Sequence, residues 1–279
     1  MVSLADCLAK GVDILRGTEY ARLEAEILLC HVLKKDRLYV AVHSRDPRST
    51  ESADRFWELC QRRAKGEPSA YITGTKEFMS LEFEVNPSVL IPRPETEMLA
   101  ELICNKYKGK NANIIDICTG SGAIACSVAH YLPDALVTAL DISEAALDVA
   151  ARNCQKTKVA HRVTLMRADA LKKIDVPQKF DLAVSNPPYI ESRVISELDT
   201  DVKDFEPRLA LDGGEDGLIF YRQIVNNIRS VLKERGELYF EIGSNQGSAV
   251  ANIMSAHFEN VTVIKDLAGL DRIVTGQLR

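Results

Sequence analysis

An amide, two prolines and an aromatic ring end one apolar run of this sequence. The run at 180–184, FDLAV, has the composition of a short buried strand, and Asn186, Pro187, Pro188 and Tyr189 follow it closely. Open α/β sheets hold their ligands beyond the carboxyl ends of their strands. These four residues are therefore candidates for a binding or catalytic site.

The chemistry of this tetrapeptide suits a planar amino group. Proline fixes φ, lacks an N–H and pushes the residue before it toward extended geometry, so Asn186 and the Pro187 carbonyl would form a rigid pair of acceptors. The amino group of an adenine or a carboxamide is a poor nucleophile, and two such acceptors would orient its nitrogen and stabilise developing positive charge. Tyr189 can lie against the flat face of the same group. We predict that residues 186–189 bind the substrate, with Asn186, Pro187 and Tyr189 as catalytic residues.

A glycine-rich turn, DICTGSGAIA at 116–125, stands at the end of another apolar run. Gly120 and Gly122 allow the backbone to turn tightly and to approach a ligand, and the following helix offers its N-terminal amides. With Ala125 as a third small residue, the spacing also fits a dinucleotide fingerprint. The turn alone therefore leaves a nicotinamide enzyme open as an alternative.

Three aspartates follow or end predicted strands. Asp116 directly precedes the glycine turn, where a carboxylate repels a pyrophosphate but accepts hydrogen bonds from an ammonium group. Asp141 is placed to accept from ribose hydroxyls, and Asp169 from the amino group of an adenine. Taken together, these acids favour S-adenosylmethionine as the cofactor. Asp141 as the N-cap of the next helix is a competing interpretation, although Ser143 can also cap that helix.

The elements around these motifs change in type along the chain. Up to about residue 70, apolar residues recur at three- and four-residue intervals, which indicates amphipathic helices. The stretch 78–85 nearly alternates, which predicts a β-hairpin. From about residue 110, apolar runs alternate with helical patterns, which predicts a parallel sheet covered on both faces; a further helix is expected at 217–234. We expect an N-terminal helical domain at 1–72, a hairpin linker at 73–93 and a catalytic domain at 94–279.

Composition excludes several classes of protein. The 279 residues are 46% hydrophobic and 27% charged, with a net charge of -5, which is ordinary for a globular protein. No apolar stretch approaches a membrane span, and the first residues lack the pattern of a signal peptide, so we expect a cytoplasmic protein with no membrane contact. The seven cysteines show no spacing typical of a zinc site or a disulfide framework, and no metal site is expected.

Five longer stretches carry a resemblance to a known family. They are YITGTKEFMSLEFEVNPSVLIPRPETE, DICTGSGAIA, SNPPYI, FEPRLALDGGEDGLIFYR and EIGSNQG. With them the chain resembles the HemK/PrmC-type peptide chain release factor N5-glutamine methyltransferases over nearly its whole length. The tetrapeptide alone also occurs in adenine-N6 methyltransferases, which remain the alternative, whereas IPRPETE and GGEDGL are much more specific.

The resemblance implies a class I S-adenosylmethionine-dependent methyltransferase: an α/β, Rossmann-like, mostly parallel sheet with a small N-terminal helical domain that helps to hold the substrate. The methyl acceptor would be the glutamine of the Gly-Gly-Gln motif of peptide chain release factors. By position, the cofactor site would include Thr96, Asp116, Cys118, Thr119, Gly120, Ser121, Gly122, Asp141, Asp169, Ala170 and Asn186.

Three positions raise specific questions. The family more often has glycine where this chain has Cys118, and a side chain there would narrow the space beside the methionine portion of the cofactor. Ala170 is smaller than the aromatic residue of some relatives, which would weaken stacking on the adenine. Arg93 of IPRPETE has two interpretations, a contact with the substrate or a lock on the hairpin.

The charge pattern bears on the choice of partner. Enzymes that act on duplex DNA need basic surface around the active-site mouth. The stretch 191–208, directly after the tetrapeptide, instead holds six acidic and three basic residues. We therefore expect a release factor as partner, no direct nucleic-acid binding, and a monomer. A nicotinamide oxidoreductase would leave the tetrapeptide unexplained, and a non-catalytic module would require a damaged tetrapeptide.

Overall fold

The computed structural model describes residues 2–48, 50–176 and 178–279 and divides into two compact units. The first unit runs to Thr75 and also includes Asp199–Phe205. The second unit comprises Lys76–Leu198 and Glu206–Arg279. Each unit has hydrophobic side chains buried in a core of its own. No helix among the described residues is long and apolar enough to cross a membrane.

The first unit is a small helical assembly, as the spacing of apolar residues predicts. Its core is formed mainly by α1, α2 and α4, and α1 crosses α4 closely at Gly11, where any Cβ would collide with the ring of Phe56. A two-residue antiparallel pair joins β1 to β2. The elements are β1 (Val2–Ser3), α1 (Leu4–Ile14), α2 (Ala21–Leu33), α3 (Arg37–Val42), β2 (Pro47–Arg48), α4 (Thr50–Ala64) and α5 (Ser69–Thr73).

A short segment far along the chain belongs to this first unit. It is Asp199–Phe205, which contains α9 (Thr200–Lys203) and lies within the range expected for the catalytic domain. Asp201 forms an ion pair with Arg63 at 3.4 Å, and a Cβ on Gly66 would lie 2.7 Å from the Thr200 methyl carbon. The helical unit is thus completed by residues distant in sequence.

The second unit is built on a seven-stranded sheet with the order β10-β11-β9-β8-β5-β6-β7. Strands β9, β8, β5, β6 and β7 are parallel to one another, and β11 runs antiparallel to both β9 and β10. The chain moves outward from β5 to β7 and then returns to β8 on the other side of β5. The strands are β5 (Asn113–Ile117), β6 (Leu136–Asp141), β7 (Val163–Arg167), β8 (Phe180–Ser185), β9 (Leu232–Glu241), β10 (Phe258–Lys265) and β11 (Asp271–Leu278).

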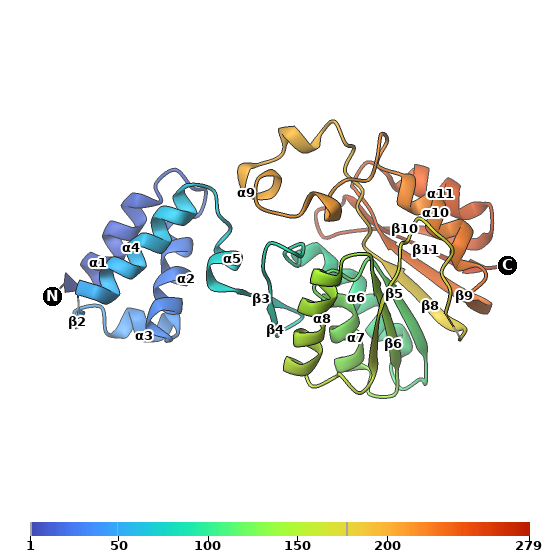
Figure 1. Ribbon diagram of the computed structural model, residues 1–279, viewed down its shortest axis with the longest axis horizontal. Helices are drawn as coiled ribbons and strands as arrows, with labels where there is room; N and C mark the ends of the chain where they lie inside the picture. Colours follow the sequence, from blue (N-terminus) through green and yellow to red (C-terminus); the bar gives the residue numbers. More distant parts are fainter. Residues whose placement is uncertain (1, 49, 177) are drawn as a thin grey trace. The chain divides into compact units, whose positions relative to one another are not determined.

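Helices cover both faces of this sheet (Figure 1). One face packs against α6 (Pro94–Tyr107), α7 (Ala123–Tyr131) and α8 (Glu144–Lys156), and the other against α10 (Ile219–Ile228) and α11 (Gly247–Ser255). Alternate strand residues enter the two cores, as expected for a doubly covered sheet. The class I α/β fold expected from the sequence is therefore confirmed. The remaining elements are β3 (Thr75–Phe78), β4 (Leu81–Glu84), and the 3-10 turns η1 (Ile195–Glu197) and η2 (Arg208–Ala210).

The helix expected at 217–234 is shorter than predicted. Helix α10 ends at Ile228, and β9 begins at Leu232 by pairing with Phe180 of β8. Arg235 has a φ of 59°, and the register shifts beside it, so the strand starts with an irregularity. The apolar spacing of this stretch fits a helix, but pairing with β8 decides its conformation, and local periodicity carries no information about that pairing.

Candidate active site

A cavity of about 360 Å³ lies in the second unit, with residues that follow β5, β6 and β8 in its wall. This is the edge at which the strand order reverses between β5 and β8, the usual ligand position in such sheets. The wall also includes Ser88–Leu90, Pro92 and Leu209, which sequence reasoning did not select. The predicted site residues in the wall are Thr96, Cys118, Thr119, Gly120, Ser121, Asp141, Asp169, Ala170, Asn186 and Pro188.

Four other predicted residues stand just outside this wall. Asp116 and Gly122 lie on either side of the wall residues Cys118–Ser121, and Pro187 and Tyr189 adjoin Asn186 and Pro188. Asp116 and Pro187 are buried, and Tyr189 is partly buried. The cavity therefore brings together both motifs that the sequence singled out, although only part of each motif faces it.

The glycine loop, residues 118–122, is shaped by its own backbone and its nearest strand. Gly120 and Gly122 have φ of 55° and 78°, in the left-handed region that favours glycine. The N–H of Thr119 donates to the Leu140 carbonyl at 2.9 Å, and the N–H of Gly120 donates to Asp141 Oδ2 at 2.9 Å. The loop is thus tied to the end of β6.

Cys118 has a φ of 63°, which explains why glycine suits this position better. An L-residue in the left-handed region costs roughly 1–2 kcal/mol. Cys118 also lines the cavity, in agreement with the expectation that a side chain here narrows the space. Burial raises the pKa of its thiol well above the usual range, so it stays protonated.

Asp116 is fully buried, and one of its two carboxylate oxygens lacks a hydrogen-bond partner among the described residues. Its Oδ2 accepts a hydrogen bond from the Thr119 hydroxyl at 2.6 Å, while Oδ1 has no hydrogen-bond partner among the described residues. Burial raises the pKa of this carboxyl to about 7 against the lowering effect of its hydrogen bonds. An ammonium group or an ordered water would satisfy the remaining oxygen, so the residue fits the cofactor inferred from the sequence.

Asp141 joins the glycine loop to the following helix. Its Oδ1 accepts from the N–H of Ser143 at 2.9 Å, while its Oδ2 holds Gly120. The N-cap of α8 is Ser143, whose hydroxyl accepts from the Ala146 N–H at 3.2 Å, so the interpretation of Asp141 as that N-cap is wrong. Burial raises the Asp141 pKa, whereas the backbone N–H groups lower it.

Asp169 lies two residues beyond the end of β7 at Arg167. Its Oδ1 accepts from the Leu171 N–H at 3.0 Å, and Oδ2 lies 3.3 Å from Lys172 Nζ. Asp169 and Ala170 both line the cavity. The turn therefore holds a carboxylate in the same wall as Asp141.

The acceptor loop, residues 186–189, continues from β8. Asn186 Nδ2 donates to Thr96 Oγ1 on α6 at 3.2 Å. Ser185 of β8 is paired in register with Phe240 of β9, so Asn186 lies beside Glu241, one position further along. Burial raises the pKa of the Tyr189 hydroxyl to about 12, which keeps it neutral.

Residues that the motifs contained, but to which sequence reasoning gave no role, hold this loop. Gln246 Nε2 donates to the carbonyls of Tyr189 at 3.1 Å and Gly217 at 3.2 Å, and its Oε1 accepts from the Gly243 N–H at 3.0 Å. A Cβ on Gly213 would lie 2.7 Å from Tyr189 Cα, and one on Gly217 would collide with the Tyr189 carbonyl. The only sequence signal for these residues was their place in GGEDGL and EIGSNQG.

Arg93 forms an ion pair with Glu206 at 2.6 Å. The Glu206 side chain is 1% exposed and that of Arg93 is 32% exposed. Arg93 also precedes α6 and lines the cavity. The pair connects the IPRPETE stretch to the FEP stretch within the second unit.

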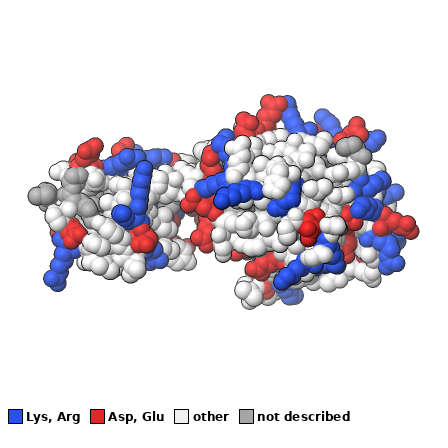
Figure 2. All heavy atoms as spheres, turned by 90° about the horizontal axis from the view of Figure 1, so that it is seen from below, with Lys and Arg blue, Asp and Glu red and all other residues white. Residues whose placement is uncertain are grey.

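The stretch 191–208 exposes fewer unpaired acidic side chains than its sequence suggests. Glu206 is buried against Arg93, Asp201 pairs with Arg63 in the first unit, and Glu191 pairs with Arg193 at 2.8 Å. Elsewhere on the surface, basic and acidic side chains are interspersed over the face seen in Figure 2. The expected acidic rim therefore contributes little to the choice between a protein and a nucleic-acid substrate.

Comparison with known proteins gives matches at the level of domains and of nearly the whole chain. Residues 6–74 match the PrmC N-terminal domain model, and residues 94–202 match the methyltransferase small domain model. A methyltransferase from Pyrococcus furiosus of known crystal structure superimposes with a TM-score of 0.53 at 17% identity, covering 71% of this chain and 89% of that one, which supports the fold.

Full-length relatives are more similar. The chain is 41% identical to a release factor glutamine methyltransferase of Clostridium acetobutylicum, over 98% of both chains. It is 45% identical to a protein of the same name from Moorella thermoacetica, over 92% of this chain and 91% of that one. This chain therefore belongs to the release factor glutamine methyltransferase family.

Proposed function

We propose that this protein transfers a methyl group from S-adenosylmethionine to the side-chain amide nitrogen of the glutamine in the Gly-Gly-Gln motif of peptide chain release factors. The observation that carries the proposal is a single cavity lined by the glycine loop, Asp141 and Asp169 on one part and by Asn186 and Pro188 on another. A cofactor site and an acceptor site that share one space suit direct group transfer. The family membership supports a release factor glutamine as the acceptor.

The cofactor would be held by the glycine loop and the three aspartates. Asp116 has a buried oxygen available to the ammonium group or to a water that bridges to it. Asp141 has lone pairs left for ribose hydroxyls after its two backbone bonds, and Asp169 with Ala170 would receive the adenine. When bound, S-adenosylmethionine supplies an electrophilic methyl group on a sulfonium sulfur.

The acceptor would be oriented by the acceptor loop. Asn186 Oδ1 and the Pro187 carbonyl accept the two N–H bonds of the glutamine amide, while Pro188 and Tyr189 pack against its plane. The nitrogen then forms a bond to the methyl carbon as the carbon–sulfur bond breaks. The methylated nitrogen is strongly acidic and loses its proton after the transfer, so no strong base is required.

An adenine-N6 activity is the alternative, because the same two acceptors fit an adenine amino group. It would require the chain to bind phosphate and extrude a base. The family membership favours the protein substrate. We infer further that the helical unit helps to recognise the release factor and that the enzyme acts as a monomer in the cytoplasm.

Methyl transfer from radiolabelled S-adenosylmethionine tests the proposal. The purified enzyme should label a bacterial release factor, and peptide mass spectrometry should place one methyl group on the glutamine of Gly-Gly-Gln. A release factor with that glutamine changed to alanine is the matched control and should give background counts. Labelling of duplex DNA or RNA alongside an unmodified release factor would overturn the proposal.

A further inference from the structure

A buried carboxylate on β9 lies beneath the acceptor loop and has no role in the proposed reaction. Glu241 is 1% exposed, and its Oε2 has no hydrogen-bond partner among the described residues. A buried ionisable group with an unsatisfied oxygen is unusual enough to need a reason. Its position beside Asn186 provides one.

The sheet register places Glu241 on the same side as Asn186 and Thr96. Val184 of β8 pairs with Tyr239 of β9, and both enter the core beneath α6. Because strand side chains alternate between faces, Asn186 and Glu241, two residues further along each strand, also point toward α6. Thr96 of α6 already accepts the hydrogen bond from Asn186 Nδ2.

The Thr96 hydroxyl and the Asn186 amide form hydrogen bonds with the Glu241 carboxyl. Burial raises the Glu241 pKa to about 7, and the contacts with Thr96 and Asn186 and the charge of Arg272 oppose that rise. An ionised carboxylate can only accept hydrogen bonds. Thr96 must therefore donate its single proton to Glu241, which leaves the Thr96 oxygen lone pairs for an N–H of Asn186.

This polarity decides which end of the Asn186 amide faces the cavity. With Nδ2 directed to Thr96, Oδ1 is the end available to accept from the substrate amino group. A protonated Glu241 could instead donate to Thr96, whose proton could then bind Asn186 Oδ1. The amide would turn and present an NH₂ group to the NH₂ group of the substrate, which cannot accept from it.

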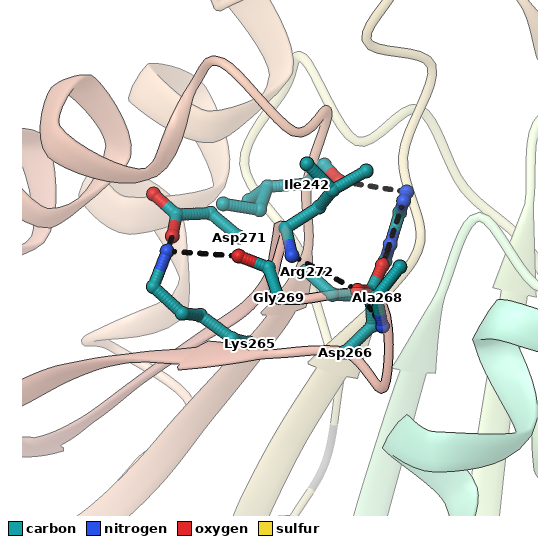
Figure 3. A network of polar contacts seen from close by, with 8 residues as sticks. Ile242, Lys265, Asp266, Ala268, Gly269, Asp271 and Arg272 are labelled. Carbon is teal, nitrogen blue, oxygen red and sulfur yellow. Dashed lines mark hydrogen bonds and ion pairs between the residues drawn. The ribbon is translucent and has the colours of Figure 1, made fainter.

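The other titratable groups near Glu241 do not replace it in orienting Asn186. Arg272 of β11 is ion-paired with Asp266 at 3.2 Å and donates to the Ile242 carbonyl at 3.5 Å, in the turn network of Figure 3. Glu95 of α6 opposes ionisation by its charge, and the neutral hydroxyl of Tyr221 on α10 donates to the Glu241 backbone carbonyl at 3.0 Å. The Tyr189 hydroxyl, whose pKa is raised by burial and by the charge of Glu241, is also neutral.

We propose that Glu241 is a positioning residue, which acts on Asn186 directly and through Thr96 to hold Oδ1 toward the acceptor cavity and so makes turnover depend on the ionised form of Glu241. The inference rests on the proposed function, since it assigns Asn186 the role of acceptor for the substrate amide. Because ionisation increases with pH, the correct orientation is present above about pH 7 and is lost below it.

The test is the pH dependence of kcat between pH 5.5 and 9, with a release factor as substrate and cofactor and substrate both saturating. Saturation matters because Asp116, whose pKa is also raised to about 7, would act on cofactor affinity. Wild-type kcat should rise through one ionisation near neutrality. A flat wild-type profile would overturn the inference.

Two variants and a control separate positioning from folding. Glu241→Gln keeps the shape of the side chain, but its amide can offer Thr96 either a donor or an acceptor and no longer fixes the orientation of Asn186. We therefore expect kcat at pH 8 to fall roughly 10- to 100-fold and the fall in kcat at low pH, the acid limb of the profile, to disappear. Thr96→Val should weaken the pH dependence without abolishing it, because the direct contact between Asn186 and Glu241 remains. Glu237→Gln changes a carboxylate on the same strand that binds Lys106 and Tyr107, and it should retain the wild-type profile.

The outcomes distinguish this inference from the proposed function. Wild-type enzyme that methylates the release factor, with Glu241→Gln folded by thermal unfolding and unchanged in kcat and pH profile, would refute the role of Glu241 alone. Wild-type enzyme that leaves the release factor unmodified at every pH would refute both. Loss of the fall in kcat at low pH in Glu241→Gln and its weakening in Thr96→Val, with its retention in Glu237→Gln, would support the role.

Discussion

The glycine loop and the acceptor loop contribute to one site, but they are held in different ways. The glycine loop is fixed by backbone conformation and by residues of the next strand, Leu140 and Asp141. The acceptor loop is fixed by side chains and glycines that lie far from it in sequence, such as Thr96, Gly217 and Gln246. Cofactor binding should therefore be a local property of the chain, and substrate positioning a property of the whole second unit.

The largest effect is expected at Asn186. Asn186→Ala removes one positioned acceptor from the reacting amide, which typically costs on the order of 100-fold or more in kcat. Cofactor affinity should change little, because the glycine loop does not depend on this side chain. Single-turnover kinetics and calorimetry measure the two effects separately. Asn226→Ala, at an exposed position on α10, is the control, and near-wild-type turnover of Asn186→Ala would contradict the role.

The opposite pattern is expected at Asp141. Asp141→Ala removes a charged acceptor for ribose hydroxyls and the bond that holds Gly120, which together should cost about 1.5–3 kcal/mol of cofactor binding. At saturating cofactor, kcat should stay within a few-fold of wild type. Calorimetric titration of S-adenosylmethionine checks the affinity, with the exposed Asp148→Ala on α8 as control. Unchanged affinity would mean that Asp141 only stabilises the turn and does not bind the cofactor.

Gly217 tests the long-range support of the acceptor loop. Gly217→Ala strains a position with φ of 70° and drives a Cβ into the Tyr189 carbonyl and to within 2.7 Å of Gln246 Nε2. Gly269→Ala has a comparable φ of 80° but no atom within 4 Å, so it measures backbone strain alone, roughly 1–2 kcal/mol. We expect Gly217→Ala to lower the unfolding free energy by more and to lower kcat about tenfold. Equal effects of the two variants would show that the close packing on Tyr189 is unimportant.

The smallest effect is expected at Cys118. Cys118→Gly relieves roughly 1–2 kcal/mol of left-handed strain but adds about 0.4–1 kcal/mol of unfolded-chain entropy. The unfolding free energy should therefore rise by roughly 0–1.6 kcal/mol, and cofactor affinity should be equal or tighter. Thermal unfolding with and without S-adenosylmethionine provides both values. A loss of stability would mean that the Cys118 side chain packs favourably.

The same contrast explains which features the sequence predicted. Gly120 and Asp141 were found because a strand end, a glycine spacing and a following strand end are local patterns. Gln246 and Glu241 were missed as functional residues because their significance depends on β9 lying beside β8. The end of α10 was also misplaced because pairing with β8 overrides a helical apolar pattern.

Long-range placement also changed the interpretation of charge. Six acids in the stretch 191–208 predicted an acidic surface, yet Glu206 is buried against Arg93 and Asp201 binds Arg63. A count of charges along the chain cannot distinguish an exposed carboxylate from one with a partner more than a hundred residues away. The residue types were predictable, whereas their partners required the fold.

The first unit is made from two separate stretches of chain, and this affects how the protein can be divided. The chain passes between the units at residues 75–76, 198–199 and 205–206. A protease that cuts at 198–199 or 205–206 leaves residues 1–75 covalently joined to the second unit, whereas a cut at 75–76 separates them from the segment Asp199–Phe205 that completes their unit. A fragment that stops at residue 75 would lack the Thr200 methyl that packs on Gly66 and the Asp201 carboxylate that pairs with Arg63. The helical unit is therefore a substructure that gene truncation alone cannot excise intact.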